Sequence, residues 1–491
     1  MTSTIPAALA RAAACFGPRY EHLLAEARRV ARALIAGGLR PGDRLALWAP
    51  NSAEWVQTAL GVAWAGGTLV PVNTRFTAVE ALDIIERSHA RGLVVVGPFR
   101  GADRLAGLRA TGATLPGLIV SIPGGWADFL ASGDAVPASE ADARAEAVTP
   151  DDVADILFTS GTTGRSKGVM SAHRQSLAVA EAWAGIAGLG PGDRYLVVNP
   201  FFNSFGLKAG ILACLVSGAA IVPEPVFDVS RTMKVIGDQR ITVLPGPPTL
   251  YTSLMDHPEA GRHDLSSLRL AVTGAAVVPP ALVERMRKEL GAEVLTAYGL
   301  TEAVVATMCR PGDDARTVAE TCGRAAAGFE VRIAGLDHEV LLRGPNTMLG
   351  YLDDPRATAG AIDAEGWLHT GDVGRLDERG YLTITDRLKD MYICGGFNVY
   401  PAEVERTLAR LPQVAESAVI GVPDQRLGEV GRAYVVCRPG QSLTAPEVID
   451  FCRGRLAGYK VPRGVVLRDE LPHNASGKVL KYLLRAEAGD D

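Results

Sequence analysis

Helical and strand-like patterns of apolar residues alternate along the N-terminal half of the chain. From Glu21 to Ala36 apolar side chains recur every three or four positions, and Gly37 and Gly38 end the pattern, which predicts a helix. A second helical pattern covers 52–65. Short apolar runs typical of buried strands stand at 44–48, 68–72, 91–96, 195–199, 219–222 and 242–244. Strands that alternate with helices favour an α/β architecture with a largely parallel sheet.

The pattern changes from about Glu339 onward. Strand-like stretches at 339–342 and 380–384 are joined by Gly and Asp turns, which is typical of an antiparallel region. After 386–390, a segment of about one hundred residues holds helix and strand patterns at 401–411, 416–421, 432–437 and 445–456. That length is ordinary for a small domain. We therefore expect two domains, 1–387 and 388–491, with a boundary at about 386–390.

The composition of the 491 residues, with 47% hydrophobic and 21% charged side chains, is that of a soluble globular protein. The net charge of −5 and the lack of a Lys/Arg-rich run do not favour a nucleic-acid partner. An anionic ligand would therefore have to be held by local groups. The seven cysteines show no Cys-x-x-Cys spacing, which supports neither a zinc site nor a disulfide framework and favours a reducing, cytoplasmic location.

The sequence predicts neither a signal peptide nor a membrane span. The first six residues lack a basic region followed by an apolar run. The most apolar stretch, 210–222, is too short to cross a bilayer and is interrupted by Ser217 and Gly218. We expect this stretch to be a buried helix that leads into a strand, with no integral membrane contact.

The segment from Thr159 to Gly168 (TSGTTGRSKG) concentrates hydrogen-bond donors directly after the apolar run 154–158. It holds three glycines, three threonines, two serines and two cations. Glycines let backbone N–H groups approach a ligand, hydroxyls donate further hydrogen bonds, and Lys167 adds positive charge. The segment is therefore interpreted as a phosphate-binding loop, although it lacks the Walker pattern. A flexible surface loop is the alternative.

The stretch 157–170 (LFTSGTTGRSKGVM) resembles the phosphate-binding signature of the adenylate-forming superfamily, which contains acyl-CoA synthetases, peptide-synthetase adenylation domains and luciferases. Further motifs of that superfamily follow in its order at 200–206, 273–276, 298–302, 370–372, 386–390 and 474–478. The resemblance implies a large N-terminal domain of parallel-sheet α/β layers with a small β-barrel-like part. A small mobile α+β C-terminal domain is expected to follow.

The reaction implied by the resemblance joins two anions. A substrate carboxylate attacks the α-phosphate of ATP, pyrophosphate leaves, and the acyl-adenylate then reacts with coenzyme A. Positive charge and a metal are needed, so the expected cofactors are ATP, Mg²⁺ and coenzyme A. In the family pattern Lys478 contacts the α-phosphate and the carboxylate, Glu302 holds Mg²⁺, and Thr301 lies beside the phosphates. Without that pattern, Lys478 would be interpreted as a solvated charge and 301–302 as the first turn of a helix.

The remaining nucleotide contacts are also assigned from the resemblance. Tyr298 offers an aromatic face to adenine, Asp372 accepts from both ribose hydroxyls, and Arg387 completes the ribose and phosphate contacts. By itself Asp372 could be only a turn residue after Gly371. The other expected ATP-binding residues lie in the phosphate loop, along the adenine wall or beside Tyr298: Thr159, Ser160, Gly161, Thr162, Thr163, Gly164, Lys167, Gly274, Ala275, Ala276 and Gly299.

Lys389 matches the hinge position of the family. There the small domain rotates between an arrangement for adenylation and one for thioester formation, and a charged, solvated residue suits such a position. In the second arrangement Gly395 and Gly396 would border the tunnel for the pantetheine arm of coenzyme A. A plain hairpin turn is the alternative interpretation of these two glycines.

The expected acyl pocket is mostly apolar or small, which fits a hydrophobic acid with a single reactive carboxylate. One residue departs from the family pattern, because acyl-CoA synthetases usually carry His where this chain has Asn203. Asn keeps hydrogen-bonding capacity but cannot carry a proton, so the orientation of the substrate is affected. The expected pocket residues are Phe202, Asn203, Ser204, Phe205, Gly206, Gly246, Pro247 and Val272.

Within the superfamily, 297–310 and 386–405 are most similar to actinobacterial ligases that attach coenzyme A to a bicyclic indanedione propanoate (HIP) formed in steroid breakdown. A medium-chain or aromatic acid is the alternative substrate. The end of the chain soon after Lys481 favours free coenzyme A over a carrier domain in cis. Loading of a carrier protein in trans, luciferase-like oxidation, and a nucleotide-binding regulator without catalysis are the other hypotheses. Oligomerisation is left open.

Overall fold

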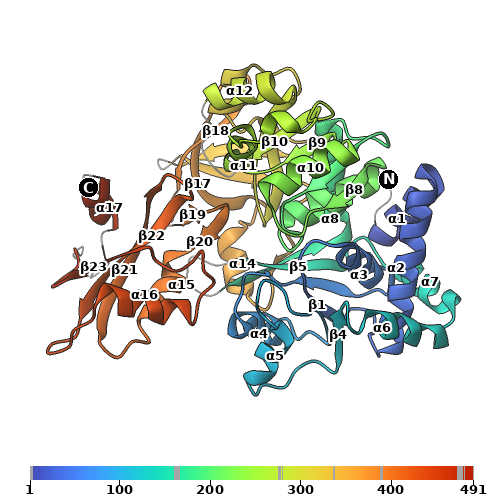
Figure 1. The fold of residues 1–491 in the computed structure, drawn as a ribbon, viewed down its shortest axis with the longest axis horizontal. Helices are drawn as coiled ribbons and strands as arrows, with labels where there is room; N and C mark the ends of the chain where they lie inside the picture. The colour runs from blue at the N-terminus through green and yellow to red at the C-terminus, as the bar shows by residue number, and fades with distance from the viewer. Residues whose placement is uncertain are drawn as a thin grey trace. The chain divides into compact units, whose positions relative to one another are not determined.

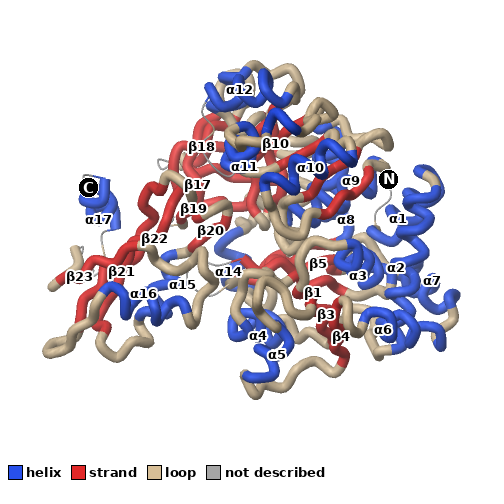
Figure 2. Tube along the Cα trace, in the orientation of Figure 1, coloured by secondary structure: helices blue, strands red, loops and turns tan. Residues whose placement is uncertain are grey.

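The computed structural model describes residues 4–159, 166–274, 278, 280–335, 338–387, 391–472, 479 and 481–489. The chain forms two compact units. The first unit contains residues 1–74, 81–158 and 168–385, and the second contains 75–80, 159–167 and 386–491. The main division along the chain therefore falls between residues 385 and 386. Figures 1 and 2 show the elements of both units.

The first sheet of the larger unit carries the strands that precede and follow the expected phosphate loop. The pairs β1–β2, β1–β3, β3–β4 and β2–β5 are parallel, as the sequence predicts, and β16 adds an antiparallel edge to β6. In spatial order its strands are β16 (Gly350–Tyr351), β6 (Lys167–Ala172), β5 (Val153–Thr159), β2 (Thr68–Pro71), β1 (Arg44–Trp48), β3 (Gly92–Val96) and β4 (Leu118–Ile122).

Helices alternate with these strands, and local sequence signals set their ends. The side chain of Ser52 accepts a hydrogen bond from the Trp55 N–H and so caps the N-terminus of the second predicted helix. Gly38, with φ of 86°, follows the end of the first predicted helix. The helices of this part are α1 (Ile5–Phe16), α2 (Pro18–Ala36), α3 (Ala53–Trp64), α4 (Ala78–Arg87), α5 (Arg104–Ala110), α6 (Trp126–Ser132) and α7 (Ala138–Ala147).

The second sheet has five parallel strands followed by two antiparallel ones. Its spatial order is β13 (Arg324–Ala325), β12 (Ala303–Met308), β11 (Glu293–Leu300), β10 (Leu270–Gly274), β9 (Val243–Pro245), β7 (Arg194–Val197) and β8 (Ala220–Pro223). Its helices are α8 (His173–Ala187), α9 (Ala213–Ser217), α10 (Val229–Gln239), α11 (Pro248–Met255), α12 (Pro280–Leu290) and α13 (Ala315–Glu320), together with a π-helix, η2 (Phe205–Leu212).

One hydrophobic core runs through both sheets and their helices. Trp55 of α3 contacts Phe201 with ring centroids 5.1 Å apart, and Trp183 of α8 contacts Phe205 edge-on at 4.8 Å. The apolar stretch 210–222 is mostly buried here as the end of η2, α9 and β8, which confirms the helix-to-strand prediction. Among the residues that the structure describes, no helix is long and apolar enough to cross a membrane.

A third, antiparallel sheet follows, as the change of pattern at Glu339 predicts. It has the order β14 (Glu330–Ala334), β15 (Glu339–Arg343), β17 (Leu368–Leu376) and β18 (Leu382–Arg387), with α14 (Pro355–Ala361) between β15 and β17. Val340, Leu342 and Leu368 pack with residues of β12 in a separate small core. This sheet is the expected β-barrel-like part of the fold.

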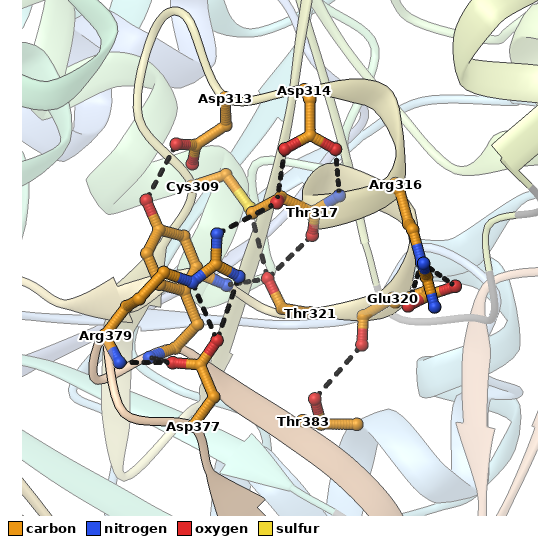
Figure 3. Close-up of polar contacts among 12 residues, drawn as sticks. Cys309, Asp313, Asp314, Arg316, Thr317, Glu320, Thr321, Asp377, Arg379 and Thr383 are labelled. Atoms are coloured by element: carbon orange, nitrogen blue, oxygen red, sulfur yellow. Dashed lines mark hydrogen bonds and ion pairs between the residues drawn. The ribbon is translucent and has the colours of Figure 1, made fainter.

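A network of polar contacts fixes the turn between β17 and β18 against α13 (Figure 3). The Tyr381 hydroxyl donates to Asp313 at 2.7 Å, and the Thr383 hydroxyl donates to the Glu320 carbonyl at 3.1 Å. Asp314 caps α13 by accepting from the backbone N–H of Thr317 at 2.9 Å. This network holds the strand that carries Asp372 and the strand that leads to residue 386.

The second unit has the α+β content that the sequence predicts. Its sheet has the order β20 (Phe397–Val399), β19 (Tyr392–Cys394), β22 (Gly428–Cys437) and β21 (Val414–Asp424), and β23 (Gly464–Arg468) pairs with β22. Its helices are α15 (Pro401–Leu408), α16 (Ala445–Arg453) and α17 (Lys481–Gly489). Side chains from all three helices join one core with the sheet.

Candidate active site

The carboxyl ends of the parallel strands in the second sheet bring distant motifs together. Strand β7 ends shortly before the 200–206 motif, and β9 ends just before Gly246. The carboxyl ends of β10 and β11 carry Gly274 and Tyr298. Parallel strands place their carboxyl ends at one edge of a sheet, which is where open α/β sheets bind ligands. The expected acyl and adenine segments therefore share one edge of the second sheet.

Two of the expected nucleotide-site glycines are required by close approach of the backbone. Gly274 pairs with Ala297 across β10 and β11, and a Cβ at Gly274 would lie 2.7 Å from the Ala297 carbonyl oxygen. A Cβ at Gly299 would lie 2.5 Å from the backbone nitrogen of Val305. Both contacts are too short for any other residue unless the backbone moves.

Thr301 and Glu302 form the two-residue turn of a β-hairpin, because Leu300 pairs directly with Ala303. The alternative that these residues begin a helix is therefore wrong. The ladder is irregular between Tyr298 and Leu300, and opposite it Val305 has a φ of 56°, which is rare for a β-branched residue. Such bulges are common beside active sites, where they redirect side chains.

Glu302 is held from two sides. Its backbone carbonyl accepts a hydrogen bond from the Met348 N–H at 2.8 Å, and its carboxylate accepts one from the Tyr351 hydroxyl at 2.8 Å. Tyr351 is part of β16 in the first sheet, so the contact ties the hairpin turn to that sheet. The sequence motifs did not indicate Tyr351, because nothing local links it to a residue 49 positions earlier.

Tyr298 and Asp372 meet although they come from different sheets. The Tyr298 hydroxyl donates to an Asp372 carboxylate oxygen at 2.6 Å, and the Asp372 side chain is almost buried in β17. Burial, followed by the nearby Asp372 charge, holds the pKa of Tyr298 well above its usual value, so the phenol keeps its proton. A carboxylate has about four acceptor positions, so this bond does not exhaust the capacity of Asp372 to accept from ribose.

A polar cluster supports the backbone on the N-terminal side of Asp372. The Gly371 N–H donates to a Glu339 carboxylate oxygen at 2.9 Å, and the Asp372 N–H donates to the Thr370 hydroxyl at 3.0 Å. The other Glu339 oxygen lies 2.9 Å from the His369 ring. Asp372 is therefore part of a strand, and the alternative that it is only a turn residue is wrong.

The expected acyl segment enters the site through a tight bend after β7. A Cβ at Gly206 would lie 2.2 Å from the Pro200 carbonyl oxygen, so only glycine fits there. Phe202 is buried, whereas Asn203, Ser204 and Phe205 are half-buried. Within the described part of the chain, the Asn203 side chain makes no hydrogen bond, although its backbone N–H donates to Pro200 at 3.0 Å.

Gly246, Pro247 and Val272 lie at the ends of the neighbouring strands β9 and β10. The Gly246 N–H donates to the Val272 carbonyl at 2.9 Å, and Pro247 is followed directly by α11. A Cβ at Gly246 would lie 2.7 Å from Leu250. The structure thus places the three residues together, at the sheet edge that also carries Phe202.

Asn51, which the sequence motifs did not indicate, fixes the start of the acyl segment. Its side-chain amide donates to the carbonyls of Val197 and Asn199 at 3.0 Å each and accepts from the Phe201 N–H at 2.8 Å. Asn51 follows β1 of the first sheet, so this buried amide joins the two sheets.

Gly395 and Gly396 form the turn between β19 and β20 in the second unit, with φ of 57° and 81°. A two-residue hairpin turn with both residues at positive φ strongly favours glycine. The hairpin interpretation therefore explains both glycines by backbone geometry alone. Their expected role beside a coenzyme A tunnel stays a prediction.

Several expected site residues cannot be placed. Thr159 ends β5 and Lys167 begins β6, so the structure describes both flanks of the phosphate loop. The backbone of Arg387 is described but its side chain is not. The others lie outside the described residues: Ser160, Gly161, Thr162, Thr163, Gly164, Ala275, Ala276, Lys389 and Lys478. Their roles stay predictions.

Glu302 is compatible with the expected Mg²⁺. Mg²⁺ at nucleotide sites is bound by one or two carboxylates together with phosphate oxygens and water, so a single protein carboxylate is sufficient. The Tyr351 hydroxyl orients the Glu302 carboxylate without neutralising it. Over the described ranges, no group of three or more His, Cys, Asp or Glu side chains could hold a metal by itself, so a metal at Glu302 would also need phosphate oxygens as ligands.

Comparison with known proteins identifies the same type of enzyme. The AMP-binding enzyme family matches residues 10–352, and the AMP-binding enzyme C-terminal domain matches 403–478. The 3-[(3aS,4S,7aS)-7a-methyl-1,5-dioxo-octahydro-1H-inden-4-yl]propanoyl:CoA ligase of Rhodococcus jostii is 58% identical over 99% of each chain. The ligase of the same name from Mycobacterium tuberculosis is 58% identical over 98% of each chain. A fatty acyl CoA synthetase structure from Mycobacterium tuberculosis superposes with a TM-score of 0.72 at 31% identity, covering 99% of each chain.

Proposed function

The chain belongs to the AMP-binding enzyme family and is an AMP-forming acyl-CoA ligase, and we propose that its acid is the indanedione propanoate HIP. The observation that carries the proposal is the 58% identity over nearly the whole chain to two ligases named for that acid. The identity falls to 31% for the fatty acyl CoA synthetase structure, so a medium-chain fatty acid is the weaker alternative.

The acyl segment supports a rigid, mostly apolar acid. Phe202 and Val272 are buried at the edge where β7, β9 and β10 end, and Phe205 is fixed by its edge-on contact with Trp183. An apolar wall made of fixed side chains suits a compact ring system better than a flexible chain, whose ordering costs entropy. Asn203, at the mouth of the proposed channel, offers an amide that can hydrogen-bond the carboxylate or a ketone.

We assign the first half-reaction to the edge of the second sheet. A carboxylate oxygen of the acid attacks the α-phosphorus of ATP, and the bond from that phosphorus to the bridging oxygen breaks, which releases pyrophosphate. Tyr298 would stack against adenine while its bond to Asp372 keeps that carboxylate aligned for the ribose hydroxyls. Lys478, outside the described residues, would neutralise the charge that accumulates where the two anions meet.

We propose that Glu302 holds Mg²⁺ together with the phosphates of ATP. When bound, the metal would supply charge neutralisation for the leaving pyrophosphate. The contribution of the chain itself is to fix Glu302 through Tyr351 and to place Thr301 next to it in the same turn. Thr159 and Lys167, at the two ends of the phosphate loop, would complete the contacts to the β- and γ-phosphates.

The second half-reaction transfers the acyl group to coenzyme A. The thiolate sulfur of coenzyme A forms a bond to the acyl carbonyl carbon. The bond from that carbon to the phosphate oxygen breaks, so AMP leaves. We propose that the small unit rotates about Lys389 between the two half-reactions and that its Gly395–Gly396 turn then borders the thiol.

A panel of acids tests the substrate. The enzyme is incubated with ATP, MgCl₂, coenzyme A and either HIP, octanoate or ferulate, and the thioester and AMP are quantified by mass spectrometry. We expect kcat/KM for HIP to exceed the other two by at least about 100-fold, because each lost apolar contact or unpaired polar group costs about 1–3 kcal/mol. A higher kcat/KM for octanoate or ferulate would refute HIP as the substrate.

A further inference from the structure

A buried ion pair lies outside the residues assigned above. Lys208 Nζ is 3.0 Å from an Asp155 carboxylate oxygen, and both side chains are only 2% exposed. Lys208 also donates to the Ser171 hydroxyl at 2.6 Å, and the Ser176 hydroxyl donates to the other Asp155 oxygen at 2.7 Å. Removing two charges from water is expensive, so a buried pair is weak evidence for a purely stabilising role.

The pair joins the helix that follows the acyl segment to the two strands that flank the phosphate loop. Asp155 is on β5, four residues before Thr159, and Ser171 is on β6, four residues after Lys167. These are the strands on either side of the phosphate loop. Lys208 is on η2, two residues after Gly206 of the acyl segment. A single ammonium group therefore contacts both loop-bearing strands from the helix that follows the acyl segment.

The helix that carries Lys208 is a π-helix, an uncommon backbone geometry. A π-helix forms poorer packing and hydrogen bonding than an α-helix and is commonly found at functional sites. Two side-chain contacts join it to other elements: the Tyr195 hydroxyl donates to the Ala209 carbonyl at 3.0 Å, and Lys208 of the helix itself reaches Asp155. These contacts constrain the helix that follows the bend at Gly206.

We propose that Lys208 and Asp155 are a positioning pair that holds the acyl segment in register with β5 and β6, the strands that flank the phosphate loop, so that the carboxylate meets the α-phosphate. This inference rests on the proposed roles of the acyl segment and of the loop. Reacting groups have to be placed within fractions of an ångström, and a displacement of about 1 Å can reduce a rate about 100-fold. Neither residue contacts a reacting atom, so the pair acts through the elements that it joins.

The test removes the charges together, because removal of one leaves a buried charge without a partner. The double variant Lys208→Met/Asp155→Asn keeps the size of both side chains and leaves an amide oxygen to accept from Ser176. Adenylation is measured as ATP–pyrophosphate exchange, and thioester formation is measured from supplied acyl-adenylate. We expect adenylation kcat to fall about 10- to 100-fold, with thioester formation and the KM for ATP changed less than about 2-fold.

A second ion pair, in which Asp193 is buried but the Arg269 side chain is 41% exposed, provides the control. Asp193 and Arg269 lie 2.6 Å apart, directly before β7 and β10 and so at the opposite edge of the second sheet. The variant Asp193→Asn/Arg269→Met removes an ion pair from the same unit and should leave adenylation kcat unchanged, with the melting temperature of both double variants measured alongside. Ser171→Ala, which removes one neutral contact of Lys208, adds a milder variant with an expected loss of about 2- to 5-fold in the same step.

The outcomes separate the pair from the choice of substrate. If HIP gives no exchange with the wild-type enzyme, the substrate proposal fails, and the test is made with whichever acid of the panel supports exchange. Unchanged adenylation in the double variant would overturn the inference. It would also be overturned by an equal loss in both half-reactions, or by an equal loss of adenylation in the control pair.

Discussion

His173 shows how the environment of one buried residue sets a property of the whole protein. It is 1% exposed at the start of α8, and its ring nitrogen Nδ1 accepts a hydrogen bond from the Ile5 N–H at 3.2 Å. An accepting Nδ1 requires the neutral ring. Burial lowers the pKa of His173 to about 4, and this effect outweighs the opposing charges of Asp155 and Asp152.

The free energy of unfolding should therefore fall as the pH drops below the pKa of an ordinary histidine. The unfolded chain takes up the proton at about pH 6.5 and the folded chain only at about pH 4, so the stabilisation is complete above 6.5 and is lost on the way down to 4. The expected loss is up to about 3 kcal/mol. Thermal unfolding followed by circular dichroism between pH 4 and 7.5 measures it.

His173→Asn provides the control, because its amide oxygen can still accept from Ile5 but does not titrate. The difference in melting temperature between pH 7 and pH 4 should be smaller in this variant than in the wild type. An identical pH dependence in the two proteins would show that His173 does not cause the acid sensitivity.

At the residue scale, the sequence predicted chemistry better than it predicted contacts. Gly274 and Gly299 could be chosen from motifs, and the structure adds the reason, which is the close approach of Ala297 and Val305. Partners far along the chain, such as Tyr351 for Glu302, could not be predicted. A single sequence contains no signal for a phenol that reaches a carboxylate from another sheet.

At the scale of elements, Asn51 joins the first sheet to the end of β7. Its amide satisfies two carbonyls and one N–H of the stretch 197–201 at 2.8–3.0 Å, and the side chain is buried. That stretch leads directly to Phe202. The position of the acyl segment thus depends on a side chain about 150 residues earlier in the chain.

Asn51→Ala should loosen the acyl segment and destabilise the protein. Three buried backbone groups would lose their partner, at a cost of about 2–4 kcal/mol after partial relaxation. Because the proposed adenine and ribose contacts, Tyr298 and Asp372, come from β11 and β17, we expect the KM for the acid to rise about 10-fold with the KM for ATP nearly unchanged. Steady-state kinetics with each substrate varied in turn measures both values.

Asn51→Asp is the informative companion variant. It retains the acceptor for the Phe201 N–H but places a carboxylate against two carbonyl oxygens. It should be at least as unstable as the alanine variant. If the KM for ATP rose as much as the KM for the acid in Asn51→Ala, the effect would be general unfolding of the site and not a local shift of the acyl segment.

The elements that apolar periodicity predicted begin and end within a few residues of observed ones, but many other helices and strands were not predicted. The run 44–48 coincides with β1, and the pattern over 52–65 contains α3. Periodicity could not distinguish the π-helix from an α-helix at 205–212, because both bury apolar side chains and the difference lies in the backbone hydrogen bonds. The tertiary contacts that this helix makes, from Lys208 to Asp155 and from Tyr195 to Ala209, also leave no local signal in the sequence.

At the scale of the whole molecule, the residues proposed to carry the chemistry are divided between two compact units. The larger unit contains Tyr298, Glu302 and Asp372, whereas Lys478 belongs to the smaller one. The family resemblance implies this division of labour, because it assigns adenylation and thioester formation to different faces of the small domain. The arrangement of the two units during each step stays a prediction.

Separate measurement of the half-reactions tests this division of labour. Lys478→Ala should abolish ATP–pyrophosphate exchange, with a fall of at least about 100-fold, because it removes the charge proposed to neutralise the meeting anions. Thioester formation from supplied acyl-adenylate should be spared.

Lys389→Pro should slow thioester formation more than ATP–pyrophosphate exchange, because the proline ring fixes φ and restricts the proposed hinge after the adenylate has formed. Arg468→Ala, which removes an exposed cation from the same small unit, should change neither step. Equal losses of both half-reactions in Lys478→Ala would contradict the two-arrangement scheme, because a lysine that acts in only one arrangement cannot slow a step carried out in the other.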